Sequence, residues 1–197
     1  LLLAAFSGVL AAPAAGQSFD LLYGPGGGYS SASSVSADGT RIGGSSSAGA
    51  TIWTRTAGTL QAMALDLPGA SGVISGDGQV VSGSRDRARS AYRWREGVPL
   101  ETLGLPTGSS LVSVASTNND GSIVVGYARF PGPQPSAPSR FQSIRWGPDG
   151  TYSEIGSATT LGSNEARAIS RDGSTIVGWA FGNTAAYKWT EAGNIQI

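Results

Sequence analysis

The chain has 197 residues, with 13 basic and 13 acidic side chains and neither Cys nor His. Balanced charge leaves no field to steer the protein onto nucleic acid or an anionic membrane. The composition excludes disulfides and thiolate chemistry, together with the commonest zinc ligand and general base. Charged residues make up only 13%, while there are 30 glycines. We therefore expect many short strands joined by glycine-rich turns.

The first sixteen residues predict an export signal. Leu1 to Ala12 form an apolar run, and small residues continue to Gly16. About a dozen apolar residues followed by an Ala-x-Ala pattern are typical of a secretory signal and its cleavage site, whereas a membrane span needs roughly 20. We expect residues 1–16 to be part of a signal that starts before Leu1, and residues 17–197 to form the repeat domain.

An Asp-Gly motif recurs four times, at intervals of 39, 43 and 52 residues. The aspartates are Asp38, Asp77, Asp120 and Asp172. A second glycine follows each aspartate after six residues, at Gly44, Gly83, Gly126 and Gly178. Asp-Gly between apolar runs is a strong hairpin signal. We expect the second glycine to let neighbouring backbones approach closely.

A tryptophan motif follows each Asp-Gly motif. Its tryptophans are Trp53, Trp94, Trp146 and Trp189. Recurrence at one place in the repeat is what packing demands, so we expect these four side chains to be structural. Trp179 lies outside the repeated position.

Each repeat holds four short strand candidates in roughly 40–45 residues, which is the content of one propeller blade. The repeats cover about 30–66, 70–105, 110–157 and 163–197. The predicted fold class is all-β, with tandem four-stranded antiparallel repeats that form a β-propeller-like array of about four blades. An elongated β-solenoid is the rival fold. Residues 19–29 resemble the segments between repeats, so in a closed propeller they could supply the fourth strand of the last blade. The last copy stops in mid-strand at Ile197, so either this strand completes it or further repeats are missing. We favour missing repeats and expect a fragment of a larger propeller.

The motifs SADGTRIGG, AYRWREG and ETLGLPTG resemble the HAF family of probable extracellular repeats. The resemblance covers residues 19–197, nearly all of the predicted mature chain. It implies secretion or surface exposure and brings no catalytic residue to transfer. The Ser-x-Asp-Gly turns also resemble those of TolB-type propellers, which implies the same fold.

The sequence supplies no convincing catalytic, cofactor or metal site. We interpret each of the four aspartates as shaping its own turn, and GPGGGY at 24–29 as a turn between repeats. The five arginines of one basic stretch would share a face if they lay on a single strand, although a solvated edge or loop is favoured; they are Arg85, Arg87, Arg89, Arg93 and Arg95. The Pro-rich insertion at 131–139 is the best candidate for a contact loop.

These observations favour a non-catalytic, exported repeat protein that binds or scaffolds at the cell surface. The expected location is secreted, extracellular or cell-surface, with the periplasm as an alternative. A surface glycan or a protein is the expected partner, with no nucleic acid, cofactor or membrane span. The alternatives are a propeller glycosidase or lyase whose catalytic residues lie in missing repeats, and an autotransporter passenger domain.

Export gives a first test. The mature N-terminus of the exported protein should lie between Ala15 and Ser18, because signal peptidase cuts after small residues. Mass spectrometry of protein recovered outside the cytoplasm measures this directly. Recovery there with Leu1 to Ala12 still attached would exclude a cleavable signal.

Overall fold

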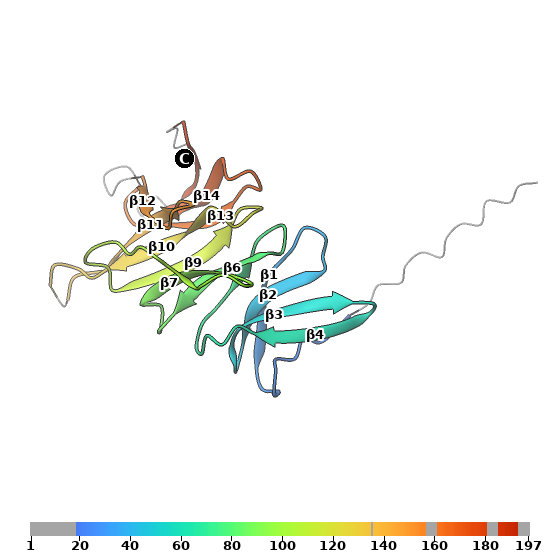
Figure 1. Ribbon diagram of the computed structural model, residues 1–197. Helices are drawn as coiled ribbons and strands as arrows, with labels where there is room; N and C mark the ends of the chain where they lie inside the picture. The colour runs from blue at the N-terminus through green and yellow to red at the C-terminus, as the bar shows by residue number, and fades with distance from the viewer. Residues whose placement is uncertain (1–18, 135, 157–160, 181–184, 193–197) are drawn as a thin grey trace, which may run out of the picture.

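The computed structural model describes residues 19–134, 136–156, 161–180 and 185–192, and within them the chain forms four antiparallel sheets (Figure 1). Blade 1 consists of β1 (Ser30–Val35), β2 (Arg41–Ser46), β3 (Gly49–Thr56) and β4 (Thr59–Ala64). Blade 2 consists of β5 (Val73–Ile74), β6 (Val80–Arg85), β7 (Ser90–Arg95) and β8 (Glu101–Leu103). Blade 3 consists of β9 (Leu111–Thr117), β10 (Val124–Phe130), β11 (Arg140–Trp146) and β12 (Tyr152–Ile155). Blade 4 consists of β13 (Asn164–Ile169), β14 (Thr175–Ala180) and β15 (Ala185–Thr190).

Within every blade the strands pair in chain order, so each blade is a simple antiparallel meander. The predicted repeats of short antiparallel strands are therefore present. The predicted signal at 1–16 and the fourth strand expected near the end of the last repeat, at 194–197, lie outside the described residues. The described part of the chain contains no helix long and apolar enough to cross a membrane.

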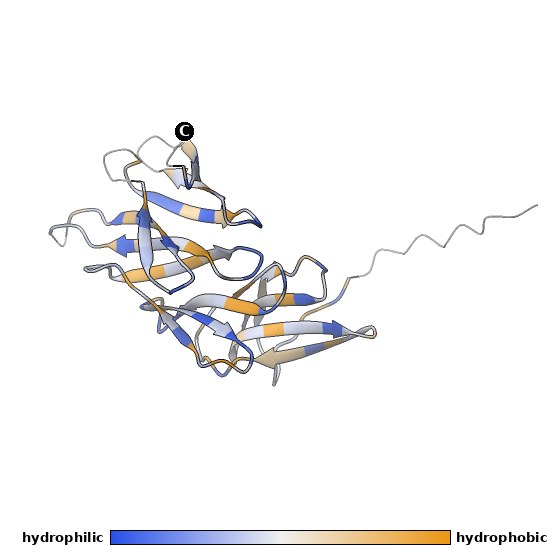
Figure 2. Cartoon of the chain, turned by 45° about the horizontal axis from the view of Figure 1, so that its top comes forward, coloured by the Kyte–Doolittle hydropathy of each residue, from blue (hydrophilic) through white to orange (hydrophobic). Residues whose placement is uncertain are grey.

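The hydrophobic core lies between blades rather than within one sheet. Three buried clusters form it, and each joins two successive blades. Ile52 of blade 1 packs with Val81 of blade 2, and Val125 of blade 3 packs with Ile176 of blade 4. Figure 2 shows orange, hydrophobic bands along the strands, interspersed with white and blue ones. A single blade cannot bury its apolar faces, so each repeat depends on its neighbour.

The second glycine of each repeat allows the first two strands to touch. A Cβ atom at Gly126 would lie 1.9 Å from the carbonyl oxygen of Ser113, and one at Gly83 would lie 1.8 Å from that of Ser71. Gly44 and Gly178 meet the corresponding carbonyls at 2.1 Å. No side chain fits at such distances, which confirms the predicted close approach.

A β-bulge accompanies this contact in three of the four blades. In blades 1, 3 and 4 the register between the first two strands shifts at Ser33, Ala115 and Arg167. Blade 2 pairs only two residues of β5, Val73 and Ile74, without such a shift. An extra residue in a strand bends it and increases its twist, so the first strands of blades 1, 3 and 4 share a curvature.

The repeated tryptophans have unequal environments. Trp53 and Trp146 are buried, at 1% and 0% exposure, which confirms their structural role. Their indole Nε1 atoms donate to the carbonyls of Tyr23 and Gly104, at 2.8 and 2.6 Å. Two further tryptophans of the repeat pack against clusters while partly exposed; they are Trp94 and Trp189. Trp179, outside the repeat, is 46% exposed.

Residues 19–29 form a loop without a strand. Three successive glycines, Gly26, Gly27 and Gly28, have φ between 77° and 88°, a conformation that favours glycine. This confirms the turn predicted for GPGGGY. The carbonyl of Tyr23 accepts a hydrogen bond from Trp53 of blade 1. In the same way the carbonyl of Gly104, which directly follows β8, accepts a hydrogen bond from Trp146 of blade 3. The segment before Tyr23 therefore lies against blade 1 much as β8 lies against blade 3.

The close contact at the second glycine predicts the effect of one added methyl group. Gly126→Ala should lower the free energy of unfolding by about 1–3 kcal/mol or more, because the new Cβ meets backbone that cannot move aside. Gly104→Ala is the matched control. Its Cβ would find its nearest atom at 3.4 Å, so a change within about 0.5 kcal/mol is expected. Denaturant unfolding compares both variants with the parent, and equal midpoints for parent and Gly126→Ala would contradict the packing described.

Candidate functional site

The Asp-Gly turns share one hydrogen-bond pattern. In blade 2 the Ser75 hydroxyl donates to Asp77 Oδ1 at 2.6 Å, and Gln79 N donates to the same oxygen at 2.9 Å. Val80 N donates to Ser75 Oγ at 3.0 Å, which closes the turn. Blades 1 and 4 repeat these bonds, and blade 3 uses Asn118 in place of the serine. The aspartates therefore shape their own turns, as predicted.

The same bonds lower the pKa of three of these carboxylates, those of Asp38, Asp120 and Asp172. The hydroxyl of Ser36 lowers the pKa of Asp38 to about 2, and that of Ser170 lowers the pKa of Asp172 to about 2. Hydrogen bonding by Ser122 also lowers the pKa of Asp120. A carboxylate stabilised as the anion is a poor proton donor near neutral pH. These groups act as hydrogen-bond acceptors within their turns.

The four turns are joined to one another through their backbones. Ala37 N donates to the carbonyl of Gly76 at 2.7 Å, Asp77 N to that of Asn119 at 2.8 Å, and Asn119 N to that of Arg171 at 3.0 Å. Apart from Asp77, these residues all occupy the variable position x of Ser/Asn-x-Asp-Gly. One repeat position thus comes together from all four blades.

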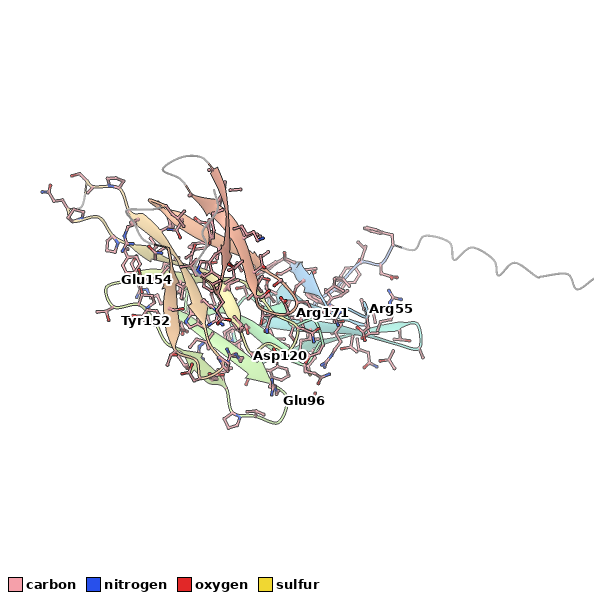
Figure 3. The ribbon with its side chains drawn as sticks, turned by 90° about the horizontal axis from the view of Figure 1, so that it is seen from above. Arg55, Glu96, Asp120, Tyr152, Glu154 and Arg171 are labelled. Carbon is pink, nitrogen blue, oxygen red and sulfur yellow. The ribbon has the colours of Figure 1, made fainter. Side chains whose placement is uncertain are left out.

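A hollow of about 250 Å³ lies at this junction. Its lining consists of Val35, Ala37, Gly76, Thr117, Asn118, Asn119, Ile169 and Arg171. Most of the lining comes from position x and from the residue just before the Ser or Asn of each turn. In Figure 3 Asp120 and Arg171 lie toward the middle of the molecule, while Tyr152 and Glu154 lie at its edge.

The hollow is lined by polar side chains on one side and by small residues on the other. Arg171 Nε donates to Asn119 Oδ1 at 2.8 Å. A Cβ at Gly76 would lie 2.6 Å from that same oxygen, so the glycine leaves room for the amide. Ala37 and Gly76 present almost no side chain, whereas Asn119 and Arg171 present hydrogen-bonding groups. Val35 and Ile169 supply apolar walls.

This lining can bind a ligand, but it offers little for catalysis. It contains no carboxylate, and the Thr117 hydroxyl donates to the carbonyl of Ile123 at 2.9 Å. The Arg171 guanidinium bonds only through Nε among the described residues, so its terminal nitrogens can donate to an oxygen of a ligand. Within the described ranges no group of three or more acidic residues gathers to hold a metal ion.

The prediction that the basic stretch could share one strand face is wrong. Arg85 ends β6, and Arg87 lies in the following hairpin turn with φ of 57°. Arg93 is buried and donates to the carbonyls of Gly147 and Ser122 in blade 3 at 2.8 and 3.0 Å. The tight turn at 86–89 breaks the strand alternation that the argument assumed. The favoured loop reading holds for this turn.

The Pro-rich insertion at 131–139 connects β10 and β11, and none of its described residues, 131–134 and 136–139, lines the hollow. The hollow was not predicted from the sequence, because only the residues shared by the four copies were considered. The signal that could have found it is a position that differs in every copy. Between constant neighbours, position x changes from Ala to Gly, Asn and Arg, and such variation on a constant scaffold marks a recognition surface.

No protein-family model and no curated protein sequence matches this chain. A protein described as TolB from Agrobacterium tumefaciens superposes with a TM-score of 0.60 and 16% identity, over 86% of this chain and 61% of its own. TolB from Acinetobacter baumannii gives 0.54 and 16%, over 83% and 44%. A streptogramin B lyase gives 0.50 and 20%, over 88% and 53%.

The chain thus spans between 44% and 61% of the length of these three structures. Identities this low show a shared fold alone. The fold is all-β and β-propeller-like, which confirms the predicted class over the solenoid.

The turn carboxylates predict an acid limit to stability. Asp38 and Asp172 have a pKa of about 2 in the folded protein, below the roughly 3.9 of an unfolded chain. Their contribution is present above about pH 4 and is lost as the pH falls toward 2. The free energy of unfolding should therefore decline over this range, and Asp172→Asn should reduce that decline. Arg129→Gln removes an exposed charge outside the turns and serves as control; an unchanged decline in Asp172→Asn would contradict the assignment.

Proposed function

We propose that this chain is a non-catalytic binding or scaffold module of an exported protein, and that it engages its ligand at the hollow between the four Asp-Gly turns. A single observation carries the proposal. The serine or asparagine and the aspartate of each turn are used in the hydrogen bonds of that turn, while the residue between them, which differs in all four copies, lines a common hollow. A rigid scaffold with variable residues at one point is suited to recognition.

Arg171 is the group that we expect to orient the ligand. Its guanidinium is positioned by Asn119 and lies beside the apolar Ile169 and Val35. Such an arrangement favours a ligand with an oxygen acceptor next to an apolar surface, which a surface glycan or a protein segment can supply. The aspartates of the turns add negative charge nearby, so a highly anionic ligand is disfavoured.

Export and family membership belong to the same proposal. The apolar run at 1–12 with its small-residue end supports removal of a signal and a secreted, extracellular or cell-surface location, with the periplasm as alternative. The repeat motifs support membership of the HAF family. A propeller enzyme with its reactive groups elsewhere remains the competing function, because a fold alone carries no chemistry.

Binding to defined surface components tests the proposal. The immobilised parent is presented with purified bacterial surface polysaccharides and, separately, with solubilised envelope proteins. A retained ligand should bind at least tenfold more weakly to Arg171→Ala and to Asn119→Ala. Gln79→Ala is the matched control, since Gln79 lies exposed on a turn outside the lining of the hollow, and it should bind as the parent does.

Two results would count against the proposal. Equal binding by Arg171→Ala, Asn119→Ala and the parent would remove the hollow from recognition. Conversion of a retained ligand into product, followed by mass spectrometry of the ligand, would contradict the non-catalytic role. Thermal unfolding of each variant separates loss of binding from loss of fold.

A further inference from the structure

Charged side chains are unevenly distributed between the two ends of the blades. Because consecutive strands are antiparallel, the Asp-Gly turns lie at one end of the blades, and the turns between second and third strands lie at the other, which we call the far end. Every charged residue of the sequence lies within the described ranges. Six acidic residues lie in turns at the Asp-Gly end; they are Asp38, Asp77, Glu96, Asp120, Asp149 and Asp172. In blades 2 and 3 the far end has the opposite composition.

Five arginines lie at the far end of blades 2 and 3, and we call them the arginine rim. They are Arg85, Arg87, Arg89, Arg129 and Arg140. In the two connections that carry them, 85–90 and 129–140, Asp86 is the only acidic residue. Its carboxylate accepts from the Ser90 hydroxyl at 2.6 Å. A surface with cations in such excess attracts anions although the whole chain carries no net charge.

The turn that carries Arg87 and Arg89 has an unusual conformation. Residues 86–88, none of them glycine, have φ of 55°, 57° and 63°, in the left-handed region that such residues rarely adopt. The amide of Val112 in blade 3 donates to the Ala88 carbonyl at 2.7 Å. Strain of this kind persists only where the surroundings impose it, and it gathers at functional sites. The turn therefore holds its two arginines in a fixed place beside blade 3.

Blade 3 supplies the other two exposed or partly exposed cations of the rim. The amide of Ser110 donates to the Arg129 carbonyl at 2.8 Å, two residues before the contact with the blade 2 turn. The Arg140 guanidinium lies 4.5 Å from the centre of the Phe130 ring, and its Nη1 donates to Gln142 Oε1 at 2.8 Å. These contacts orient Arg140 and leave further N–H groups of its guanidinium for a ligand.

A second hollow, of about 410 Å³, adjoins the basic turn. Its lining consists of Arg89, Ser109, Ser110, Leu111 and Val112. It combines a cation, two hydroxyl groups and apolar surface, which suits an acidic sugar. All four strands of blade 2 and of blade 3 are described, so this hollow lies between two complete blades.

The arrangement of the rim fits a polymer with repeated negative charge. Its cations are spread over two blades and do not converge on one point, as they would around a single small anion. None of the described residues in 85–90 and 129–140 is an exposed large apolar side chain. Surfaces that bind a bilayer insert such side chains, and surfaces that bind single-stranded nucleic acid stack bases on exposed aromatic rings. These observations favour a polysaccharide over either alternative.

We propose that the arginine rim is a second binding surface and that it binds an acidic polysaccharide. The guanidinium groups of Arg87 and Arg89 bond carboxylate or phosphate groups of the polymer, and the hydroxyls of Ser109 and Ser110 contact neighbouring sugar hydroxyls. The rim shares no residue with the hollow between the Asp-Gly turns, so the two surfaces can be tested separately.

Binding of polygalacturonate, with uncharged dextran as the matched polymer, tests the proposal. The parent should bind polygalacturonate and not dextran, and the affinity should fall steeply as salt is added. Arg87→Gln combined with Arg89→Gln should weaken binding at least tenfold. Arg55→Gln combined with Arg95→Gln removes the same charge from exposed arginines at the Asp-Gly end, and this control should bind within twofold of the parent.

Three results would overturn the proposal. The first is a parent that does not bind polygalacturonate even at low salt. The second is equal weakening by the two double variants, because net charge alone would then explain the binding. The third is tighter binding, at equal salt, to phosphatidylglycerol vesicles or to duplex DNA than to polygalacturonate. Arg129→Gln should weaken binding at least threefold, and an unchanged affinity would contradict a surface shared by two blades. Thermal unfolding confirms that each variant remains folded.

Discussion

The contact between the first and second strands of each blade, at the glycine six residues after the aspartate, is the constraint on which the repeat depends. There the carbonyl of one strand occupies the space of a missing side chain on the other, at about 2 Å from where a Cβ would be. In three blades the first strand also carries a β-bulge at this contact. The inner strands then bring their turns within hydrogen-bond distance of one another, and the shared hollow follows from that.

The Ser-x-Asp-Gly turn joins the first two strands of the blade and contributes residues to the lining of the hollow. Its serine and aspartate satisfy each other and the turn backbone, so they contribute rigidity without reactivity. The side chain of the residue between them takes no part in these bonds, and it differs in all four copies. If the hollow binds the proposed ligand, a repeat can change its surface chemistry at this residue while it keeps the turn.

Much of the fold could be predicted from the sequence, because turns and strand pairing are local. The Asp-Gly pairs, the second glycines and the buried tryptophans at 53 and 146 all have short-range signals. The hollow could not be predicted in the same way. Whether Ala37, Gly76, Asn119 and Arg171 meet depends on how the blades curve around a common axis, and no short window of sequence encodes that curvature. The basic stretch failed for a related reason: a four-residue turn at 86–89 divides it between two strands.

The short pairing of β5 affects local opening of the structure. Only two residues of β5, Val73 and Ile74, pair with the second strand of blade 2. The first strands of blades 1 and 3 pair with their second strands over five and six residues. Amide protons in this segment should exchange with solvent sooner than those of β9 or β13, since fewer bonds must open. Local opening there would separate Gly76 from Asn119, so the rim of the hollow would loosen well before the rest of the protein unfolds.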